Sequence, residues 1–200
     1  MIKNIVFDVG GVVVRWDPAS ILAELVPDSP YHEELIQEIF TSDEWPLMDQ
    51  GAITGAEATQ NICSRLTGPM RDDALHVMRG WQNCLPLHDG ILELMKELKS
   101  HGHGVFILSN ASDNFYDIPT LHEPLALVDG ALVSCEERLA KPDERIYRRF
   151  FEKFSLIPQE CLFTDDLPAN VAGSRAAGMD AVVFKSVAAF RLELIKRELI

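Results

Sequence analysis

The sequence predicts an α/β protein: a Rossmann-like core with a five-stranded parallel sheet and helices on both faces, and an inserted helical-bundle cap. Two observations lead to this prediction. An apolar strand at residues 2–7 is followed by about seventy residues of helical periodicity without a strand. From residue 86 onward, short apolar runs alternate with amphipathic segments, which is typical of a parallel sheet covered on both faces. We therefore expect a core formed by residues 1–16 and 86–200 and a cap formed by residues 17–85.

The N-terminal part of the chain contains one strand and then only helices. Residues 2–7, IKNIVF, end at an Asp-Val-Gly-Gly turn and have the pattern of a buried strand. Helix start and stop residues then follow at intervals typical of short helices. Four short helices are expected in the cap, marked by Ser29-Pro30, the capping-box pair Thr54 and Glu57, Gly68 as a stop, and Pro69 as a further start.

The part after residue 86 alternates between strands and helices. An amphipathic helix ends at Gly102 and is followed by the apolar run GVFILS. Without residues 17–85, 131 of the 200 residues remain, which is enough for five strands and their helices. The further predicted elements are strand 104–109, a helix-poor stretch, strand 131–134, a helix over 142–154, strand 161–164, a helix ending at 178, strand 181–184 and a final helix.

Composition and charge exclude several classes of protein. With 47% hydrophobic and 24% charged residues, the chain is neither collagen-like nor wholly disordered. No apolar run reaches bilayer length, so a membrane is not an expected partner. A formal net charge of −13 would repel phosphate backbones, which excludes nucleic acid. Residues 17–85 carry twelve Asp and Glu against three Arg, which favours a separate structural unit.

The N-terminal run and the cysteines indicate a cytoplasmic location. The run IVFDVGGVVV contains Asp8 and lacks a small-residue cleavage site after it, so we interpret it as mature sequence. The four cysteines are far apart and form no CxxC or Cys/His cluster, as expected for reduced thiols in the cytoplasm. We expect a monomer or a weak dimer.

Polar side chains stand at the ends of three predicted strands. In an open parallel sheet, ligands bind beyond the carboxyl ends of the strands. Carboxylates gathered there repel one another unless a cation joins them, and oxygen ligands favour Mg²⁺. An Asp beside a metal and a lysine is placed to attack a phosphoryl group. The candidates are Asp8 after the first strand, Ser109 and Asn110 at the second, Asp165 and Asp166 after the fourth, and Lys141 before a helix.

Four segments resemble the four motifs of the haloacid dehalogenase-like hydrolase superfamily, in the same order and with matching spacing. They are FDVGG at 7–11, LSNAS at 108–112, KPDERIY at 141–147 and FTDDLPANVAG at 163–173. The resemblance covers essentially the whole chain, and the insert after the first strand matches the family's helical cap. The first motif and the segment QGAITGAE most resemble the bacterial glucose-1-phosphatase-like branch, which is related to the phosphatase domain of soluble epoxide hydrolases.

The resemblance implies a Mg²⁺-dependent phosphatase that acts on a small phosphorylated metabolite, with a sugar phosphate as the expected substrate. By position, Asp8 would be the nucleophile that forms a phosphoaspartyl intermediate, and Lys141 would pair with it and stabilise the transition state. Mg²⁺ would be bound by Asp8, the Gly10 carbonyl and Asp166, with Asp165 helping directly or through water, while Ser109 and Asn110 would hold the phosphoryl oxygens.

Two positions depart from the family pattern. Most phosphatases of the superfamily have a second Asp, a general acid, where this chain has Gly10, and losing such an acid costs ~10²–10⁴-fold in rate. Our hypothesis is that the leaving group needs little help, so that anomeric or aryl phosphates are preferred. Asp17 and Asp49 are the alternative acids. Arg138 stands where relatives usually have a glycine, and a local change is expected in that loop.

The tryptophans and histidines are assigned mainly to structure. Large aromatic residues are more often part of a core, which we expect for Trp81. Trp45, close to the cap loop, is predicted to line a substrate pocket. The six histidines are scattered without ligand spacing, so no histidine metal site is predicted.

Three other functions stay open. A metal-independent 2-haloacid dehalogenase would also lack the second Asp, although the retained pair Asp165-Asp166 argues against it. A catalytically inactive relative that binds a metabolite or a protein would explain Gly10, but it would not need both Asp8 and Lys141. A phosphomutase would require the acid-base residue that is missing here.

Overall fold

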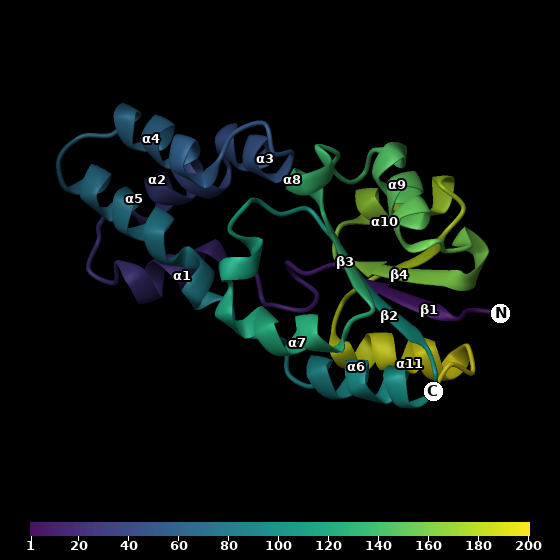
Figure 1. The fold of residues 1–200 in the computed structure, drawn as a ribbon. Coiled ribbons are helices and arrows are strands. Elements are labelled where there is room, and N and C mark those ends of the chain that lie inside the picture. Colours follow the sequence, from purple (N-terminus) through teal and green to yellow (C-terminus); the bar gives the residue numbers. More distant parts are fainter.

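The computed structural model describes residues 1–200, and a five-stranded sheet lies at its centre (Figure 1). Its strands are β1 (Asn4–Phe7), β2 (Gly104–Ser109), β3 (Gly130–Val133), β4 (Cys161–Asp165) and β5 (Asp180–Val183). They pair in parallel in the order β3-β2-β1-β4-β5. Phe7 lies level with Ile107 and Thr164, so β1, β2 and β4 end at the same edge. The prediction of five parallel strands is confirmed.

Helices cover both faces of the sheet, as predicted (Figure 1). The stretch between β2 and β3, expected to be poor in helix, contains the short helix α7 and two 3-10 turns. The strands are apolar because both faces are buried; GVFILS of β2 is buried from its second residue onward. One face carries α6 (Ile91–Ser100), α7 (His122–Leu127) and α11 (Val187–Lys196), and the other carries α9 (Glu144–Phe154) and α10 (Pro168–Ala176).

Five α-helices lie between β1 and α6, beyond the carboxyl edge of the sheet (Figure 1). They are α1 (Pro18–Leu25), α2 (His32–Leu35), α3 (Glu44–Asp49), α4 (Gly55–Arg65) and α5 (Gly68–Gly80). A π-helical turn, Ile36–Phe40, continues α2, and a 3-10 turn, Trp81–Cys84, follows α5. The sequence predicted four helices here, one fewer than the structure has. Buried side chains of this segment belong to the same hydrophobic cluster as those of β1, so sheet and helices share one core.

Two helix boundaries in this segment differ from the prediction. The helix expected to begin at Ser29-Pro30 begins at His32, because the Ser29 hydroxyl accepts a hydrogen bond from Tyr31 N in the turn before it. Gly68, expected to end α4, instead begins α5, since α4 already ends at Arg65.

Arg138 follows α8 (Ser134–Glu137) in the left-handed backbone region, with φ 53° and ψ 35°. Glycine adopts this conformation without a steric cost, which explains why a glycine suits the position. Arg138 keeps the same kind of turn while adding a long side chain to the loop before Lys141.

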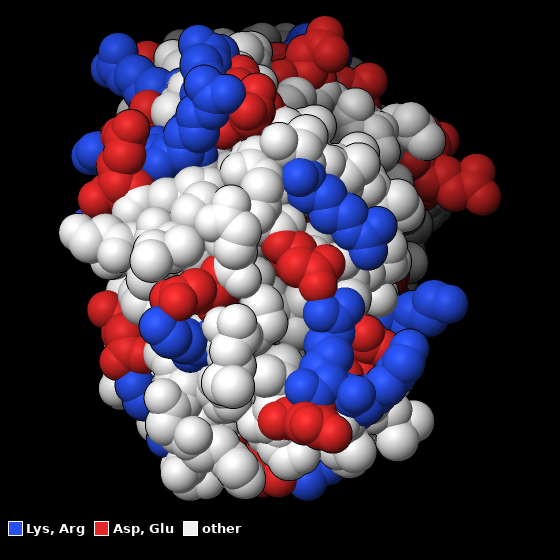
Figure 2. Space-filling model, turned by 90° about the vertical axis from the view of Figure 1, so that its right-hand side faces the viewer, with Lys and Arg blue, Asp and Glu red and all other residues white.

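The charged side chains are interspersed on the face of the molecule that carries the N-terminus. Figure 2 shows acidic and basic groups side by side there, with uncharged areas between them. Some of the charged groups form ion pairs, such as the exposed pair of Arg148 with Glu144 and the half-buried pair of Arg197 with Asp180. None of the helices is both long enough and apolar enough to cross a membrane.

Candidate active site

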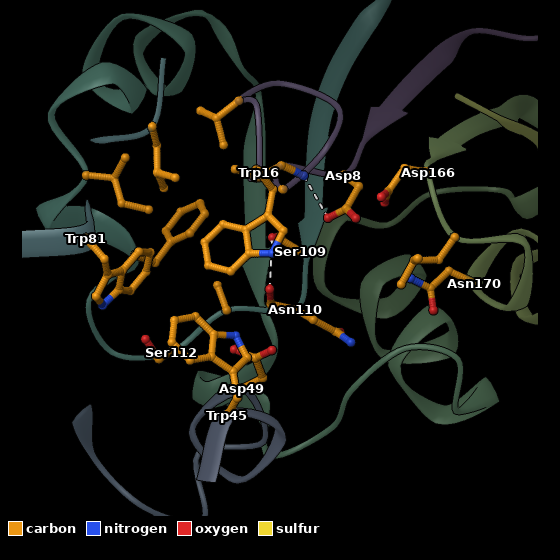
Figure 3. Close-up of a pocket in the computed structure, with 18 residues that line it drawn as sticks. Asp8, Trp16, Trp45, Asp49, Trp81, Ser109, Asn110, Ser112, Asp166 and Asn170 are labelled. Atoms are coloured by element: carbon orange, nitrogen blue, oxygen red, sulfur yellow. Dashed lines mark hydrogen bonds between the residues drawn. The ribbon is translucent and has the colours of Figure 1, made fainter. Parts of the chain in front are cut away.

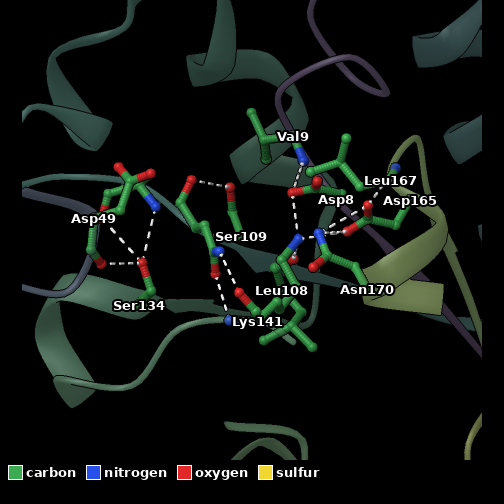
Figure 4. A network of polar contacts seen from close by, with 12 residues as sticks. Asp8, Val9, Asp49, Leu108, Ser109, Ser134, Lys141, Asp165, Leu167 and Asn170 are labelled. Carbon is green, nitrogen blue, oxygen red and sulfur yellow. Dashed lines mark hydrogen bonds and ion pairs between the residues drawn. The ribbon is translucent and has the colours of Figure 1, made fainter. Parts of the chain in front are cut away.

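A buried lysine joins the ends of two neighbouring strands (Figure 4). Lys141 Nζ lies 2.8 Å from Oδ1 of Asp8, which follows β1, and 2.7 Å from Oδ2 of Asp165, the last residue of β4. It also donates a hydrogen bond to the Leu108 carbonyl at 3.0 Å. Because the Lys141 ammonium is fully buried, it needs these acceptors to remain charged. The structure thus brings together the predicted nucleophile and the predicted lysine.

Asp8 has one carboxylate oxygen that is held and one that is free. Oδ1 accepts a hydrogen bond from Val9 N at 2.7 Å and contacts Lys141, whereas Oδ2 has no donor within the protein. The backbone is fixed as well, since Asp8 N donates to the Thr164 carbonyl at 3.0 Å. Burial raises the pKa of Asp8 to about 8, although the Lys141 ammonium acts in the opposite direction. Burial thus outweighs Lys141 alone, and further positive charge, such as a bound cation, would favour the ionised carboxylate that a nucleophile needs.

Asp165 is surrounded by hydrogen-bond donors. Asn170 Nδ2 lies 3.0 Å from both of its oxygens, Leu167 N donates to Oδ1 at 2.8 Å, and Lys141 contacts Oδ2. The Tyr147 hydroxyl donates in turn to the Asn170 carbonyl at 2.7 Å. With both oxygens engaged, Asp165 is suited to hold Lys141 and Asn170 in place. Asn170 and Tyr147 were not predicted as site residues from the sequence. The available signal was the position of Asn170, in the first turn of the helix after the acidic pair.

Three carboxylates converge at this edge of the sheet. Oxygens of Asp8, Asp165 and Asp166 all lie within 4.8 Å of one another. Gly11 has a φ of 73°, and a Cβ there would lie 2.6 Å from Asp166 Oδ2, so the backbone of Gly11 passes directly beside this carboxylate. Burial and the neighbouring Asp165 raise the pKa of Asp166. Three carboxylates face one ammonium, and the available ligand atoms are all oxygens. This set fits a divalent cation such as Mg²⁺.

Ser109 and Asn110, the predicted phosphate-binding pair, have different surroundings. The Asn110 side chain is paired with the backbone of Lys141 in both directions: Nδ2 donates to its carbonyl at 2.9 Å, and Oδ1 accepts from its N–H at 2.8 Å. Asn110 therefore fixes the Lys141 loop to the end of β2. The Ser109 hydroxyl makes only a 3.4 Å contact to the Asn110 carbonyl and lines a cavity beside Asp8.

This cavity has a volume of about 310 Å³ and is lined by both parts of the chain (Figure 3). Asp8 and Asp166 contribute from the sheet edge, and Trp45 and Asp49 contribute from α3. Gly10 also lines it, and a Cβ at this position would meet no atom within 4 Å. The place of the missing general acid is therefore open space.

The two alternative acids lie in different environments. Asp49 lines the cavity, where burial raises its pKa to about 7 and the Lys141 ammonium acts in the opposite direction. Asp17 is not part of the lining: its carboxylate caps α1, accepting hydrogen bonds from Ala19 N at 3.1 Å and from the Ser20 hydroxyl at 2.6 Å. Asp49 therefore lies in the cavity wall, whereas both oxygens of Asp17 are used to begin a helix.

All three tryptophans border the cavity. The expected place of Trp45 in the wall agrees with the structure. Trp81, expected in the core, is only 6% exposed and belongs to the hydrophobic cluster, but it lines the cavity as well. Trp16, for which the sequence left both a pocket and a core position open, lines the cavity as well.

The curated proteins with related sequences include the following three. The sesquiterpene phosphatase astK of Aspergillus oryzae is 26% identical over 178 residues, which cover 88% of this chain and 87% of that protein. The (S)-2-haloacid dehalogenase 4A of Burkholderia cepacia is 27% identical over 142 residues, or 70% of this chain and 58% of that enzyme. The rat bifunctional epoxide hydrolase 2 is 24% identical over 179 residues; they are 85% of this chain but only 31% of that protein.

A solved structure and a family match agree with these related sequences. A haloacid dehalogenase family enzyme of Bacteroides thetaiotaomicron, crystallised with magnesium and inorganic phosphate, superimposes with a TM-score of 0.72. The match covers 94% of this chain and 96% of that one at 23% identity. The haloacid dehalogenase-like hydrolase family matches residues 2–178. The chain therefore belongs to the haloacid dehalogenase-like hydrolase family.

Proposed function

We propose that this protein is a Mg²⁺-dependent phosphatase that hydrolyses a small phosphate monoester through a phosphoaspartyl intermediate on Asp8. The observation that carries the proposal is the buried Lys141, which holds one oxygen of Asp8 and leaves the other free beside a cavity. The retained acidic group, the phosphatase among the related sequences, and the magnesium and phosphate in the related structure support it.

The chemistry follows from the charges around Asp8. Its free oxygen would attack phosphorus in line with the ester oxygen; the P–O bond breaks, and the leaving group takes the electron pair and then a proton. Water would next attack the phosphoaspartate, releasing phosphate and restoring Asp8. Lys141 would offset negative charge throughout, and the Ser109 hydroxyl would bind a phosphoryl oxygen.

The metal would bind where the three carboxylates converge. Asp8, Asp166 and the Gly10 carbonyl would hold Mg²⁺, with Asp165 placed behind them by its own hydrogen bonds. When bound, Mg²⁺ supplies positive charge that offsets both the carboxylates and the phosphoryl oxygens.

The helical segment, residues 17–85, is proposed to act as a cap on the core. Trp45 and Asp49 of this segment face the same cavity as Asp8, so a substrate bound at Asp8 would touch both parts. The sugar phosphate expected from the sequence is one possible ester, and α-glucose 1-phosphate tests it.

A 2-haloacid dehalogenase is the second candidate. The related dehalogenase sequence and the glycine at position 10 favour it. The acidic pair Asp165-Asp166 favours the phosphatase, because a metal-independent reaction gains nothing from three carboxylates within 4.8 Å.

Phosphate release from a panel of esters tests the proposal. Phenyl phosphate, p-nitrophenyl phosphate and α-glucose 1-phosphate would each be assayed with Mg²⁺, with a chelator, and with the Asp8→Asn variant. Asp17→Asn is the matched control, since it makes the same change at a helix cap outside the cavity. We expect release that requires both Mg²⁺ and Asp8. Halide release from 2-haloacids without any phosphate release would instead identify a dehalogenase, and neither product would indicate a binding protein.

A further inference from the structure

The cavity beside Asp8 has a polar end and an apolar end. Of its 18 lining residues, 10 are hydrophobic, and none is Lys, Arg or His. Figure 3 shows Asp8, Asp166 and Asn170 on one side, Trp81 on the other, and Trp16 between them. We call the apolar end the aromatic chamber; it is formed by Trp16, Trp45, Trp81, Leu85, Phe115 and Ile118.

Three tryptophans form a continuous wall of the aromatic chamber. The ring centroids of Trp16 and Trp45 lie 5.3 Å apart, those of Trp16 and Trp81 5.7 Å, and those of Trp45 and Trp81 5.2 Å. Phe40 packs behind Trp16 and Trp45 at 5.8 and 5.2 Å. Because each ring is braced by its neighbours, the wall is preformed and offers a rigid apolar surface at little entropic cost.

The aromatic chamber provides few partners for hydroxyl groups. Away from the sheet edge, the polar side-chain groups of the cavity are those of Asp49 and Ser112 and the indole N–H groups of the tryptophans, of which Trp81 Nε1 is fully buried. A sugar placed there would exchange several hydrogen bonds to water for fewer to the protein, and each unpaired polar group disfavours binding. A hydrocarbon would lose nothing and would bury its surface against indole rings.

We propose that the organic group of the substrate is an apolar hydrocarbon of aryl type, bound in the aromatic chamber while its phosphate lies at Asp8. This rests on the phosphatase function proposed above. An aryl substrate also accounts for Gly10. When the P–O bond breaks, the aryl oxygen keeps the electron pair as a phenolate and takes a proton from water afterwards, so no positioned acid is needed. Of the two leaving groups expected from the sequence, the aryl group fits this lining and the anomeric sugar does not.

A size series of esters with similar leaving groups tests the proposal. Phenyl and 2-naphthyl phosphate release alcohols of similar acidity, so a difference between them reports contact with the protein. We expect kcat/KM for 2-naphthyl phosphate to exceed that for phenyl phosphate about tenfold, mainly through KM, because the second ring buries further apolar area. α-Glucose 1-phosphate should be at least tenfold poorer than phenyl phosphate.

Substitutions in the wall show whether the difference between the two aryl esters arises in the aromatic chamber. Trp45→Ala should remove the advantage of 2-naphthyl over phenyl phosphate, and Trp45→Phe should retain most of it. Tyr116→Ala is the control, since Tyr116 is an aromatic residue that is 50% exposed and outside this cavity. Melting curves of each variant separate a lost contact from a lost fold.

The results distinguish this proposal from the phosphatase function. If esters are hydrolysed but 2-naphthyl phosphate is no better than phenyl phosphate, or α-glucose 1-phosphate is best, the apolar substrate is wrong and the phosphatase stands. If no ester is hydrolysed, calorimetry can still test the aromatic chamber. It would compare the binding of the two aryl esters to the Asp8→Asn protein. Tighter binding of 2-naphthyl phosphate supports the aromatic chamber, and equal or absent binding overturns it.

Discussion

At the scale of single residues, the site consists of fixed charges around one free oxygen. Lys141 is held by Asp8, Asp165 and Leu108, and Asp165 is held by Asn170. A group that is fixed before the substrate arrives need not reorganise during the reaction, which is the main source of electrostatic catalysis. The exception is Gly10, where the structure has space instead of a functional group.

This space makes a gain of function testable. Gly10→Asp should raise kcat for alkyl phosphates and change aryl phosphate hydrolysis little, because only a poor leaving group needs a general acid. The gain should be about 10²-fold in an Asp49→Asn background, where Asp49 cannot supply the proton. The new Cβ would meet no atom within 4 Å. Steady-state rates on one alkyl and one aryl ester measure the effect.

Gly11→Asp is the matched control for that substitution. Its backbone has a positive φ, and its Cβ would lie 2.6 Å from Asp166 Oδ2, so it should lower activity on both esters. Equal rates for Gly10→Asp and the natural chain on the alkyl ester would show that position 10 does not reach the leaving group.

Asp49 leads to a prediction about pH. Burial raises its pKa to about 7, so its carboxyl is protonated below pH 7 and loses the proton above it. For alkyl phosphates, where a proton donor matters, kcat should fall as pH rises through about 7. Aryl phosphates should show no such fall.

Asp49→Asn distinguishes this acid from other titrating groups. The variant should lower kcat for alkyl esters by about 10²-fold and abolish the fall near pH 7, since an amide does not titrate. An unchanged pH profile in this variant would assign the transition to another group.

At the scale of elements, sequence patterns correctly predicted interactions between residues that are close in the chain. The capping box of α4 is an example: Thr54 Oγ1 accepts from Glu57 N at 3.2 Å, and Glu57 accepts from Thr54 N at 2.8 Å. The five strands follow from apolar runs, and the order of polar residues along the chain placed Asp8 and Lys141 correctly at one edge.

Contacts between distant segments could not be predicted in this way. Asn110 pairs with the backbone of Lys141, 31 residues away, and Tyr147 reaches Asn170, 23 residues away. No periodicity specifies such partners, because they depend on how the elements pack. For the same reason the sequence identified Trp45 as a wall residue but left both a pocket and a core position open for Trp16.

The capping box gives a prediction at this scale. Thr54→Ala should lower the free energy of unfolding by about 1 kcal/mol, because one backbone N–H at the start of α4 loses its acceptor. Thr59→Ala is the control in the same helix: its hydroxyl donates only to the Gly55 carbonyl, and alanine has the higher helix propensity. Urea unfolding of both variants measures the difference, and equal destabilisation would contradict the capping role.

At the scale of the whole molecule, the helical segment is fixed to the core at the end of α3. The Ser134 hydroxyl donates to the Asp49 carbonyl, so the end of α3 is attached to the segment that follows β3. Two residues further on, Gly51 has a φ of 65° and lies so close to Cys135 that a Cβ would overlap the Cys135 carbonyl oxygen. Trp45 and Asp49 are therefore held in the cavity wall by a contact that only glycine permits.

Gly51→Ala tests whether this contact positions the wall. The added methyl would push the end of α3 away from the core, and a displacement of about 1 Å in a positioning group costs on the order of 10²-fold in rate. We expect kcat/KM for aryl phosphates to fall by about that factor. Gly68→Ala is the control, because Gly68 also has a positive φ, 57°, but a Cβ there would meet nothing within 4 Å. Both variants bear the same backbone strain, so both should melt a few degrees lower, and only Gly51→Ala should lose activity. If the two lost activity equally, the effect would come from strain alone, and the cavity wall would not depend on the contact between α3 and the core.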